Sequence, residues 1–399
     1  MTSRYDVAVV GAGIIGLGAA YAALRRGLSV IVVDRSARTV GSTIRNFGHV
    51  CIGAQDGAAR QYADASRPLW LALARDAGFW LRPSGTLVAA RHDDEQALLG
   101  EAAAAGGIRL LSRDELAARA PVDPGVVTGG AWIDTDLQAH PREAADAIAA
   151  HLAGRGVAFA WRTAVTGVAP GTVSTTRGEI RAERIVVAVN HDLDQLLPEL
   201  AEAHDVQRCT LDMLRVDAAL AAPLSAPLLT GWSLTRYGRF AALPAAAAVA
   251  ARLADERPDL AALDLNQMYT QLPDGTLIVG DTHHREVSPP PFQHESAADA
   301  LLAETAALFG IPVPRVVERW QGVYASGVGE VLAERPADGI TVLAATTGIG
   351  MTIGLGLAER ELARSWDLPA PDLAPDPATH VASDLAPEPA TDPALEGAS

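Results

Sequence analysis

The first 34 residues alternate short apolar runs with one helical pattern, as a strand–helix–strand unit does. Tyr5–Val10 is a valine-rich apolar run, Ile14–Arg26 has apolar residues at helical spacing, and Leu28–Val33 is a second apolar run. These lengths and periods favour strand, helix and strand in turn. Because neither strand alternates with polar residues, the pattern predicts a parallel sheet covered on both faces.

Similar segments recur later in the chain and extend this predicted sheet. They are a helical pattern at Pro141–Gly154 and apolar strands at Val157–Trp161, Ile185–Val189 and Ile340–Ala345. Other segments carry turn signals instead. Thr86–Ala90 follows a Pro-Ser-Gly turn and is predicted to be a hairpin arm. Met268–Leu272 and Thr276–Asp281 flank Pro-Asp-Gly, which predicts a β-hairpin.

This alternation predicts an α/β chain (α+β overall) in which a discontinuous Rossmann-like domain is interleaved with an antiparallel-sheet substrate domain. The first comprises residues 1–80, 140–205 and 318–368, and the second 81–139 and 206–317. The segment 369–399 has seven prolines, six acidic residues and neither arginine nor aromatic side chains. Such a composition buries too little apolar surface to offset the entropy of ordering, so we expect a disordered, acidic, proline-rich tail.

Charge and composition exclude several classes of function. The net charge of −16 disfavours binding to nucleic acid or to an anionic membrane. All 32 basic residues are arginine, so the lysine Schiff base of a pyridoxal-phosphate enzyme is ruled out. Cys51 and Cys209 cannot form a CxxC pair or a four-cysteine zinc site, and so few thiols suit a reducing compartment. We see no targeting segment and no apolar run of the roughly 18 residues that span a bilayer, so we expect a cytoplasmic protein.

A glycine pattern after the first strand carries the first chemical signal. Gly11-x-Gly13-x-x-Gly16 opens the predicted helix, where it permits a tight turn, close approach of a pyrophosphate and close helix–strand packing. The helix N-terminus offers free N–H groups to the phosphates. Asp34 ends the second strand, where an acid accepts hydrogen bonds from a ribose. That acid would repel the 2′-phosphate of NADP, although Arg35 beside it would attract one. The pattern predicts a dinucleotide site.

Two further glycine-rich segments favour FAD over NAD. The loop Gly41–Gly48 is polar and offers donors for a long cofactor from Ser42, Thr43, Arg45 and Asn46. The segment 344–354 places a second glycine-rich turn after a strand and before a final helix, roughly Ile353–Ser365. A helix N-terminus there suits the negative charge of a reduced flavin. The alternative for this segment is a purely structural strand–turn–helix connection.

These segments together resemble the D-amino-acid oxidase, glycine oxidase and sarcosine oxidase superfamily of FAD-dependent amine oxidoreductases. The matching stretches are Val9–Leu17, Val32–Asp34, Gly41–Gly48, Trp320–Gly322 and Thr347–Gly354. They spread over nearly all of residues 1–368, in the family's order. Arg45–Gly48, Trp232–Phe240 and Thr276–His284 also resemble a bacterial branch associated with phosphonate breakdown.

The resemblance implies roles at the matching positions. Towards the ADP part these are Gly11, Gly13, Ile14, Ile15, Gly16, Asp34, Arg35 and, through its backbone at the adenine, Val165. Towards the ribityl chain and flavin they are Ser42, Thr43, Arg45, Asn46, Gly48, Gly322, Gly348, Gly350, Met351 and Thr352. Some relatives attach FAD to a cysteine near the end of the Trp-x-Gly segment. Residues 320–326 contain no cysteine here, so we expect non-covalent FAD.

The substrate side is predicted from chemistry alone. A flavin takes the hydride of an amine directly, so the protein must chiefly orient the substrate, and arginine matches a carboxylate or phosphonate bidentately. Of the arginines in the predicted substrate domain we favour Arg236 and Arg285 over Arg215, Arg239 and Arg252. His49, Tyr269 and Tyr324 are further candidates for orienting the substrate. His283-His284 lacks a third ligand at metal spacing, so no metal site is expected.

The predicted function is FAD-dependent dehydrogenation of a small amine with an anionic group, giving an imine that hydrolyses. Candidate substrates are a D- or N-methyl amino acid, glycine or an aminophosphonate. Some sarcosine oxidases activate oxygen with a lysine, which this chain lacks, so the electron acceptor stays open between O2 and another compound. The alternatives are an FAD-dependent reductase that uses a pyridine nucleotide, and a non-catalytic FAD-binding protein or sensor. The oligomeric state is left open.

Overall fold

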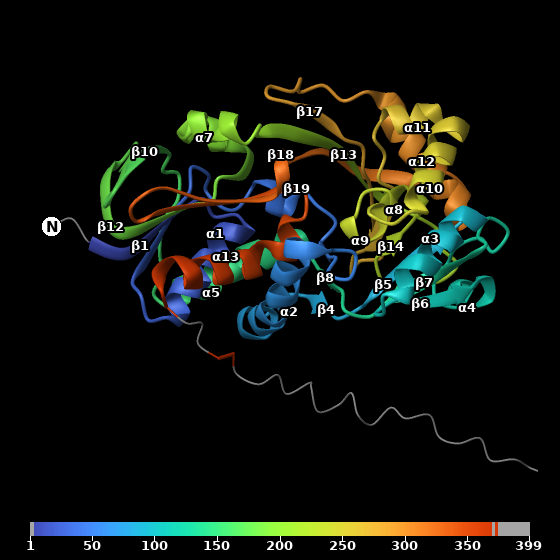
Figure 1. Cartoon of the computed structure of the whole chain (residues 1–399), viewed down its shortest axis with the longest axis horizontal. Coiled ribbons are helices and arrows are strands. Elements are labelled where there is room, and N and C mark those ends of the chain that lie inside the picture. The colour runs from blue at the N-terminus through green and yellow to red at the C-terminus, as the bar shows by residue number, and fades with distance from the viewer. Residues whose placement is uncertain (1–3, 369–371, 374–399) are drawn as a thin grey trace, which may run out of the picture.

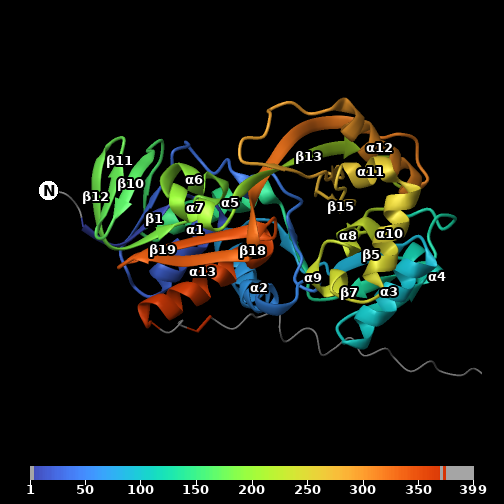
Figure 2. The same ribbon diagram turned by 45° about the horizontal axis from the view of Figure 1, so that its top comes forward.

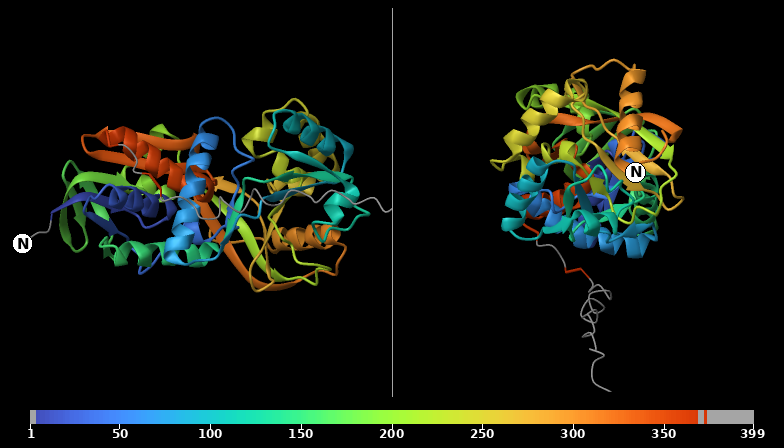
Figure 3. Two further views of the ribbon diagram at one scale, coloured as in Figure 1. Left: turned by 90° about the horizontal axis from the view of Figure 1, so that it is seen from below. Right: turned by 90° about the vertical axis from the view of Figure 1, so that its right-hand side faces the viewer.

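The protein, seen here in a computed structural model, is described over residues 4–368 and 372–373. The predicted tail therefore lies almost entirely outside the described residues. Within the described part, 16 strands join in one continuous sheet that runs through both halves of the molecule. Figures 1 and 3 show these halves side by side along the longest axis. The α/β class and the Rossmann-like arrangement are confirmed.

One half is built on a parallel sheet in the order β19-β12-β1-β2-β9. Its strands are β1 (Arg4–Val10), β2 (Val30–Val33), β9 (Ala158–Ala160), β12 (Gly178–Val187) and β19 (Ile340–Thr347). One face is covered by α1 (Ile14–Arg25), α2 (Gly57–Ala77), α5 (Pro141–Gly154) and α13 (Gly350–Trp366). The other is covered by β10 (Val165–Ala169), β11 (Thr172–Thr175), α6 (Leu193–Leu196) and α7 (Pro198–Ala203), with the short helices η1 (Ser42–Ile44) and η2 (Asn190–Asp192) in the connections.

Coverage on both faces explains the apolar strands. Along β1, Val7 and Val9 pack with the helices, whereas Ala8 and Val10 pack with the layer of β10, β11 and α7. Side chains alternate between the faces of a strand, so both faces need apolar residues. The predicted helix at Pro141–Gly154 has the expected bounds. The strand predicted at 185–189 is longer and starts at Gly178, because its first part pairs with β11 before its end enters the parallel sheet.

The other half is largely antiparallel, in the order β6-β7-β5-β14-β15-β16-β13-β18. Its strands are β5 (Thr86–Ala90), β6 (Arg109–Ser112), β7 (Gly129–Ile133), β13 (Gln207–Asp217), β14 (Leu228–Leu229), β15 (Met268–Gln271), β16 (Leu277–Gly280), β17 (His284–Glu286) and β18 (Arg315–Ala337). Its helices are α3 (Asp93–Ala104), α4 (Arg113–Ala117), α8 (Gly231–Leu234), α9 (Gly238–Ala241), α10 (Ala246–Glu256), α11 (Pro258–Ala262) and α12 (Glu295–Phe309). A separate small sheet, β3 (His49–Val50), β8 (Leu137–Ala139) and β4 (Leu81–Arg82), lies between the halves.

The predicted hairpin is confirmed as β15 and β16. The prediction of a local hairpin arm at Thr86–Ala90 was wrong, because β5 pairs with the distant strands β7 and β14. The first part of β18 pairs with β13 and its last part with β19, so this strand crosses the predicted domain boundary at 317/318 (Figure 2). The division into two domains stays a prediction.

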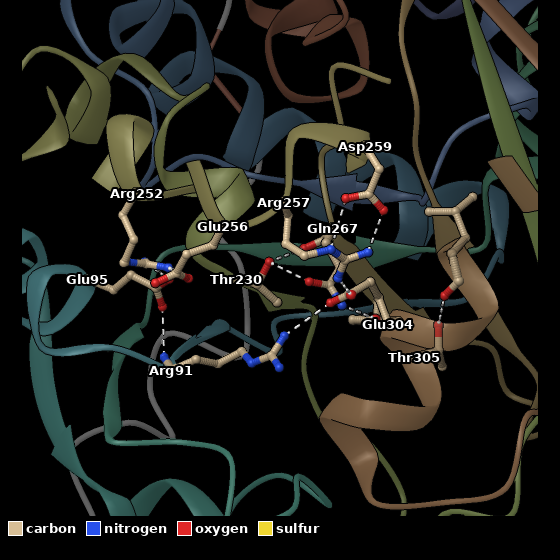
Figure 4. A network of polar contacts seen from close by, with 12 residues as sticks. Arg91, Glu95, Thr230, Arg252, Glu256, Arg257, Asp259, Gln267, Glu304 and Thr305 are labelled. Atoms are coloured by element: carbon tan, nitrogen blue, oxygen red, sulfur yellow. Dashed lines mark hydrogen bonds and ion pairs between the residues drawn. The ribbon is translucent and has the colours of Figure 1, made fainter. Parts of the chain in front are cut away.

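Ion pairs to two buried glutamates join the helices that cover the antiparallel half (Figure 4). Arg252 of α10 binds Glu95 of α3, and Arg257, just after α10, binds Glu304 of α12. Both glutamates are buried, and each also accepts a hydrogen bond from Arg91. A buried carboxylate needs such partners to offset its desolvation. Within the described part of the chain, no helix combines the length and apolar character needed to cross a membrane.

Candidate functional site

The turn between β1 and α1 can be formed only with glycine at two positions. Gly11 has φ +102°, and a Cβ there would lie 2.5 Å from the carbonyl oxygen of Ala188. A Cβ on Gly16 would lie 1.9 Å from the oxygen of Gly11, so the first turn of α1 packs directly on this loop. Gly13 is the N-cap residue of α1, with no side chain to cap the helix. The positive end of α1 is thereby left open towards the space beside it.

Asp34, at the end of β2, fixes this turn from the side. One carboxylate oxygen accepts a hydrogen bond from Ala12 N at 2.8 Å, and the other accepts one from Ser36 N at 2.8 Å. A carboxylate has about four acceptor positions, so two remain for hydroxyl donors. Arg35 beside it is turned to Asp192, with Nη2 2.6 Å from Oδ2.

The loop at 41–48 packs beside the N-terminus of α1 and satisfies one of its free N–H groups. Thr43 Oγ1 accepts a hydrogen bond from Ile14 N at 2.9 Å, and Ser42 Oγ donates to the carbonyl oxygen of Val323. Asn46 folds the loop on itself, since Nδ2 donates to the backbone oxygens of Ser42 and Thr43 and Oδ1 accepts from Gly48 N. These contacts hold a polar edge next to the glycine turn.

The late glycine-rich turn reaches the same place from the other end of the chain. Gly348 has φ +81°, and the helix α13 that follows has no side-chain cap at its N-terminus. Thr352 Oγ1 accepts a hydrogen bond from Cys51 N at 3.0 Å. A Cβ on Gly354 would lie 3.1 Å from side-chain atoms of Ile14 and Ile15. The N-terminal parts of α1 and α13 are therefore in contact.

A single cavity of about 940 Å³ runs along both helix N-termini and continues to the antiparallel sheet. Most of the predicted site residues line it: Gly11, Gly13, Ile14, Ile15, Asp34, Arg35, Ser42, Thr43, Arg45, Asn46, His49, Val165, Arg236, Arg285, Tyr324, Gly348, Gly350, Met351 and Thr352. Gly16, Gly48 and Gly322 instead support the walls. A Cβ on Gly48 would lie 2.0 Å from the oxygen of Ala139, and one on Gly322 would lie 2.9 Å from Leu211.

Tyr269 is the predicted residue that the structure places elsewhere. It is 0% exposed, its hydroxyl accepts a hydrogen bond from Gln267 Nε2 at 2.7 Å, and its ring packs edge-on against Phe309. Its neighbour Met268 lines the cavity. Because successive residues of a strand point to opposite faces, Tyr269 faces the core of the antiparallel half and cannot orient a ligand in the cavity.

His49 forms part of a hydrogen-bonded wall. Its Nε2 lies 2.7 Å from Thr86 Oγ1 and 3.3 Å from Asp136 Oδ2, and Asp136 also accepts from Gly53 N. Burial raises the pKa of the Asp136 carboxyl, but the hydrogen bonds from His49, Thr86 and Gly53 outweigh it and hold the pKa below its usual value. The atoms of His49, Cys51 and Asp136 that could bind a metal ion lie within 4.8 Å of one another. His49 and Asp136 are hydrogen-bonded to each other there.

At the antiparallel end of the cavity, two arginines share one carboxylate. Arg236 and Arg285 both form ion pairs with Asp264. His283 Nδ1 lies 2.9 Å from the backbone oxygen of Asp264, so this nitrogen carries the proton and donates it to that bond. Burial, helped by the nearby charge of Arg236, lowers the pKa of His283 to about 3. The imidazole is therefore neutral.

The cavity also holds groups that the sequence did not reveal. Asp281 and Asn266 line it, at 4% and 6% exposure, and burial raises the pKa of Asp281 to about 7. Tyr237 lines it too, and burial raises the pKa of its hydroxyl well above the usual value. Asn190, at φ +53°, donates from Nδ2 to Ser42 Oγ at 2.9 Å. Asp281 is the last residue of the predicted hairpin strand Thr276–Asp281, which was the one signal available for it.

Comparisons with known proteins agree with this geometry. A family model described as "DAO: FAD dependent oxidoreductase" matches residues 6–364. Glycine oxidase from Geobacillus kaustophilus has 19% identity and a TM-score of 0.72, with 91% of this chain and 98% of that chain covered. L-proline dehydrogenase from P. horikoshii has 17% identity and a TM-score of 0.76, with 92% and 95% covered. L-alpha-glycerophosphate oxidase from Mycoplasma pneumoniae with FAD bound has 17% identity and a TM-score of 0.69, with 94% and 97% covered. A search of curated proteins found no match.

Proposed function

Because this chain belongs to the family of FAD-dependent oxidoreductases, we propose that it oxidises the carbon–nitrogen bond of a small amine carrying an anionic group. The product is an imine, which water hydrolyses to a carbonyl compound and an amine or ammonia. One observation carries the proposal: the cavity that begins at two glycine-rich helix N-termini ends at a pair of arginines. The first part suits a dinucleotide and the second an anion.

The donor set of the cavity fits FAD. Gly11 and Gly13 leave no side chain between the backbone and a pyrophosphate, and Asp34 keeps acceptor positions for the hydroxyls of a ribose. We propose that Gly348, Gly350 and their neighbours to Thr352 hold the flavin end, where the N-terminus of α13 stabilises negative charge on the reduced ring. FAD supplies the two-electron acceptor, and the residues here bind and orient it.

We propose that the FAD is held without a covalent bond. Residues 320–326, where some relatives carry an attaching cysteine, contain none. Unfolding the purified protein and passing it through a size filter tests this. All of the flavin is expected in the filtrate, and flavin that stays with the chain would contradict the proposal.

Arg236 and Arg285 are the proposed anion-binding groups. In the structure both pair with Asp264, and a substrate anion would compete with that carboxylate for their planar, bidentate donors. A carboxylate of glycine, of a D-amino acid or of an N-methyl amino acid fits this pair. So does a phosphonate, whose additional oxygen matches two guanidinium groups, and the resemblance of the segments around Arg236 and Asp281 to a phosphonate-associated branch supports that choice.

A panel of such amines, assayed with the FAD-loaded protein, tests the function. Reduction of an artificial dye and formation of hydrogen peroxide are measured separately, because dye reduction without peroxide identifies an acceptor other than O2. Arg236→Gln is expected to raise KM about 10- to 100-fold, the loss of a charged hydrogen bond. Arg315→Gln, an exposed arginine paired with Asp217, is the matched control and should leave KM unchanged. A panel without turnover would favour a non-catalytic FAD protein, and flavin reduction by NADH would favour a reductase.

We also propose a cytoplasmic location. Cys51 and Cys209 are both buried, free thiols, which suits a reducing compartment. Fractionation of the source cells tests this, and recovery of the protein outside the cytoplasm would contradict it.

A further inference from the structure

We infer that Asp281 is a catalytic base, which binds the substrate's ammonium group together with Asn266 and takes one of its protons. The inference rests on the proposed amine oxidation and adds a residue that the family assignment does not supply. It concerns the chemical state of the amine, since only a neutral amine, with its lone pair free, can be oxidised to an imine.

The backbone fixes Asp281 and Asn266 next to each other. Asp281 N donates to Asn266 O at 2.6 Å, and Asn266 N donates to Asp281 O at 2.8 Å. This reciprocal pair lies just beyond the ladder of β15 and β16, which ends at Met268 and Gly280, so both residues sit where the two strands end at the cavity. The two reciprocal backbone hydrogen bonds fix the two residues opposite each other.

The pair presents hydrogen-bond acceptors to the cavity. Asn266 Nδ2 donates to Asp281 Oδ1 at 3.0 Å, which leaves Asn266 Oδ1 buried and without a hydrogen-bond partner among the described residues. The other oxygen, Asp281 Oδ2, lies 3.6 Å from His283 Nε2, beyond hydrogen-bonding distance. An unpaired buried acceptor costs free energy, so the site is completed by a ligand that brings N–H donors. An ammonium group brings two or three.

The two arginines and Asp281 together match a substrate that carries both an anionic group and an ammonium group. Arg236 and Arg285 lie in the same end of the cavity but form their ion pairs with Asp264, and neither forms one with Asp281 among the described residues. A small amino acid or aminophosphonate therefore meets positive groups for its anion and an acidic group for its amine. Before the anion binds, these two guanidinium groups hold the pKa of Asp264 below the usual value despite its burial, so Asp264 is then the weaker base of the two.

The surrounding charges suit Asp281 to a proton transfer near neutral pH. Burial raises the pKa of Asp281 to about 7, and the negative charge of Asp264 adds to this increase. The positive charge of Arg236 and the hydrogen bond from Asn266 act in the opposite direction. The other groups that face it are neutral near pH 7, since His283 has a pKa of about 3 and burial raises the pKa values of Tyr237, Tyr324 and Cys209. A base is most effective when its pKa is near the working pH.

The proposed step moves one proton and no electrons. An N–H bond of the substrate ammonium breaks, an O–H bond forms on Asp281, and the electron pair stays on nitrogen. The two-electron oxidation that follows uses FAD, as the family's chemistry requires. An aliphatic amine with a pKa near 10.4 is neutral in only about one part in two thousand at pH 7, so a base next to it matters.

The test compares Asp281→Asn with the unsubstituted holoenzyme in anaerobic flavin reduction over a range of pH. The amine is the best substrate of the panel. The unsubstituted protein should keep its reduction rate down to about pH 7. The variant should be about 100-fold slower at pH 7 and should gain up to tenfold per pH unit towards the amine's own pKa. Asp212→Asn, in which the same change is made outside the cavity beside Thr282, should match the unsubstituted enzyme.

A second readout is independent of turnover and of the variant's folding. The flavin spectrum of the unsubstituted holoenzyme is used to measure the binding of two probes. One is 2-aminoisobutyrate, an ammonium compound without an oxidisable C–H, and the other is isobutyrate, which has no amino group. If the panel selects phosphonates, the phosphonate counterparts of these two acids are used. The ammonium probe should bind more tightly as pH rises through about 7, whereas the amine-free acid should bind more weakly. Two flat affinities, or a variant with the unsubstituted pH profile, would overturn the role of Asp281 while leaving amine oxidation intact. An unsubstituted enzyme that no amine reduces would instead overturn the proposed function.

Discussion

Replacing Asp281 by asparagine should stabilise the folded protein above about pH 4, increasingly so up to about pH 7, although it slows catalysis. The carboxyl ionises near pH 3.8 as a free side chain and near 7 in the fold, a difference of about 3 pKa units. Because the pKa is raised in the folded state, the free energy of unfolding is highest below about pH 4 and falls as pH rises to about 7. Three pKa units correspond to a total loss of about 4 kcal/mol at high pH, and about 2 kcal/mol of this loss occurs between about pH 5.5 and 8.5. Asparagine does not ionise and retains an acceptor for Asn266.

Urea unfolding followed by tryptophan fluorescence measures this effect, with the same FAD loading in all samples. The free energy of unfolding of Asp281→Asn should exceed that of the unsubstituted protein by about 2 kcal/mol at about pH 5.5 and by about 4 kcal/mol at about pH 8.5. If the difference for Asp281→Asn is absent, or does not increase with pH, the carboxylate is not held in the low-dielectric site described here.

Three further substitutions, one of them with a matched control, test other parts of the account. Gly16→Ala places a Cβ 1.9 Å from a backbone oxygen, so it should weaken FAD binding at least tenfold in equilibrium titrations. The control is Gly100→Ala, which adds a Cβ in open space on a helix and should stabilise the protein by about 0.5–1 kcal/mol. Arg236→Gln should raise KM, as steady-state kinetics would show. Tyr269→Phe should leave kcat and KM unchanged and cost about 1 kcal/mol in unfolding, through the lost bond to Gln267; a loss of activity would place Tyr269 in the site after all.

Local patterns made the parallel half predictable. The strand–helix–strand unit up to Asp34 depends on contacts between neighbouring segments, and its glycines carry their own signal. The strand β18 was not predictable in the same way. Its glycines, Gly322, Gly327 and Gly329, and its Pro336 each suggest a break, yet Arg315–Ala337 forms one strand. Distant partners hold it, β13 first and β19 after an irregularity between Ser326 and Val331.

The cofactor side of the cavity was likewise more predictable than the substrate side. The glycine turns and Asp34 act through local backbone geometry, which their spacing reveals. Asp281 and Asn266 come together only through the pairing of β15 with β16, and neither residue type is distinctive at its position. Tyr269 was misplaced because a strand pattern does not say which of its two faces meets the cavity, and Met268 occupies that face.

Anaerobic titration of the FAD-loaded protein with the amine panel tests the central claim most directly. The protein should bind FAD in the cavity described here, and an amine with an anionic group should bleach its visible absorbance in a one-to-one stoichiometry. The same acids without the amino group should leave the absorbance oxidised. A protein that takes up no FAD, or a bound flavin that every amine leaves oxidised, would contradict the account.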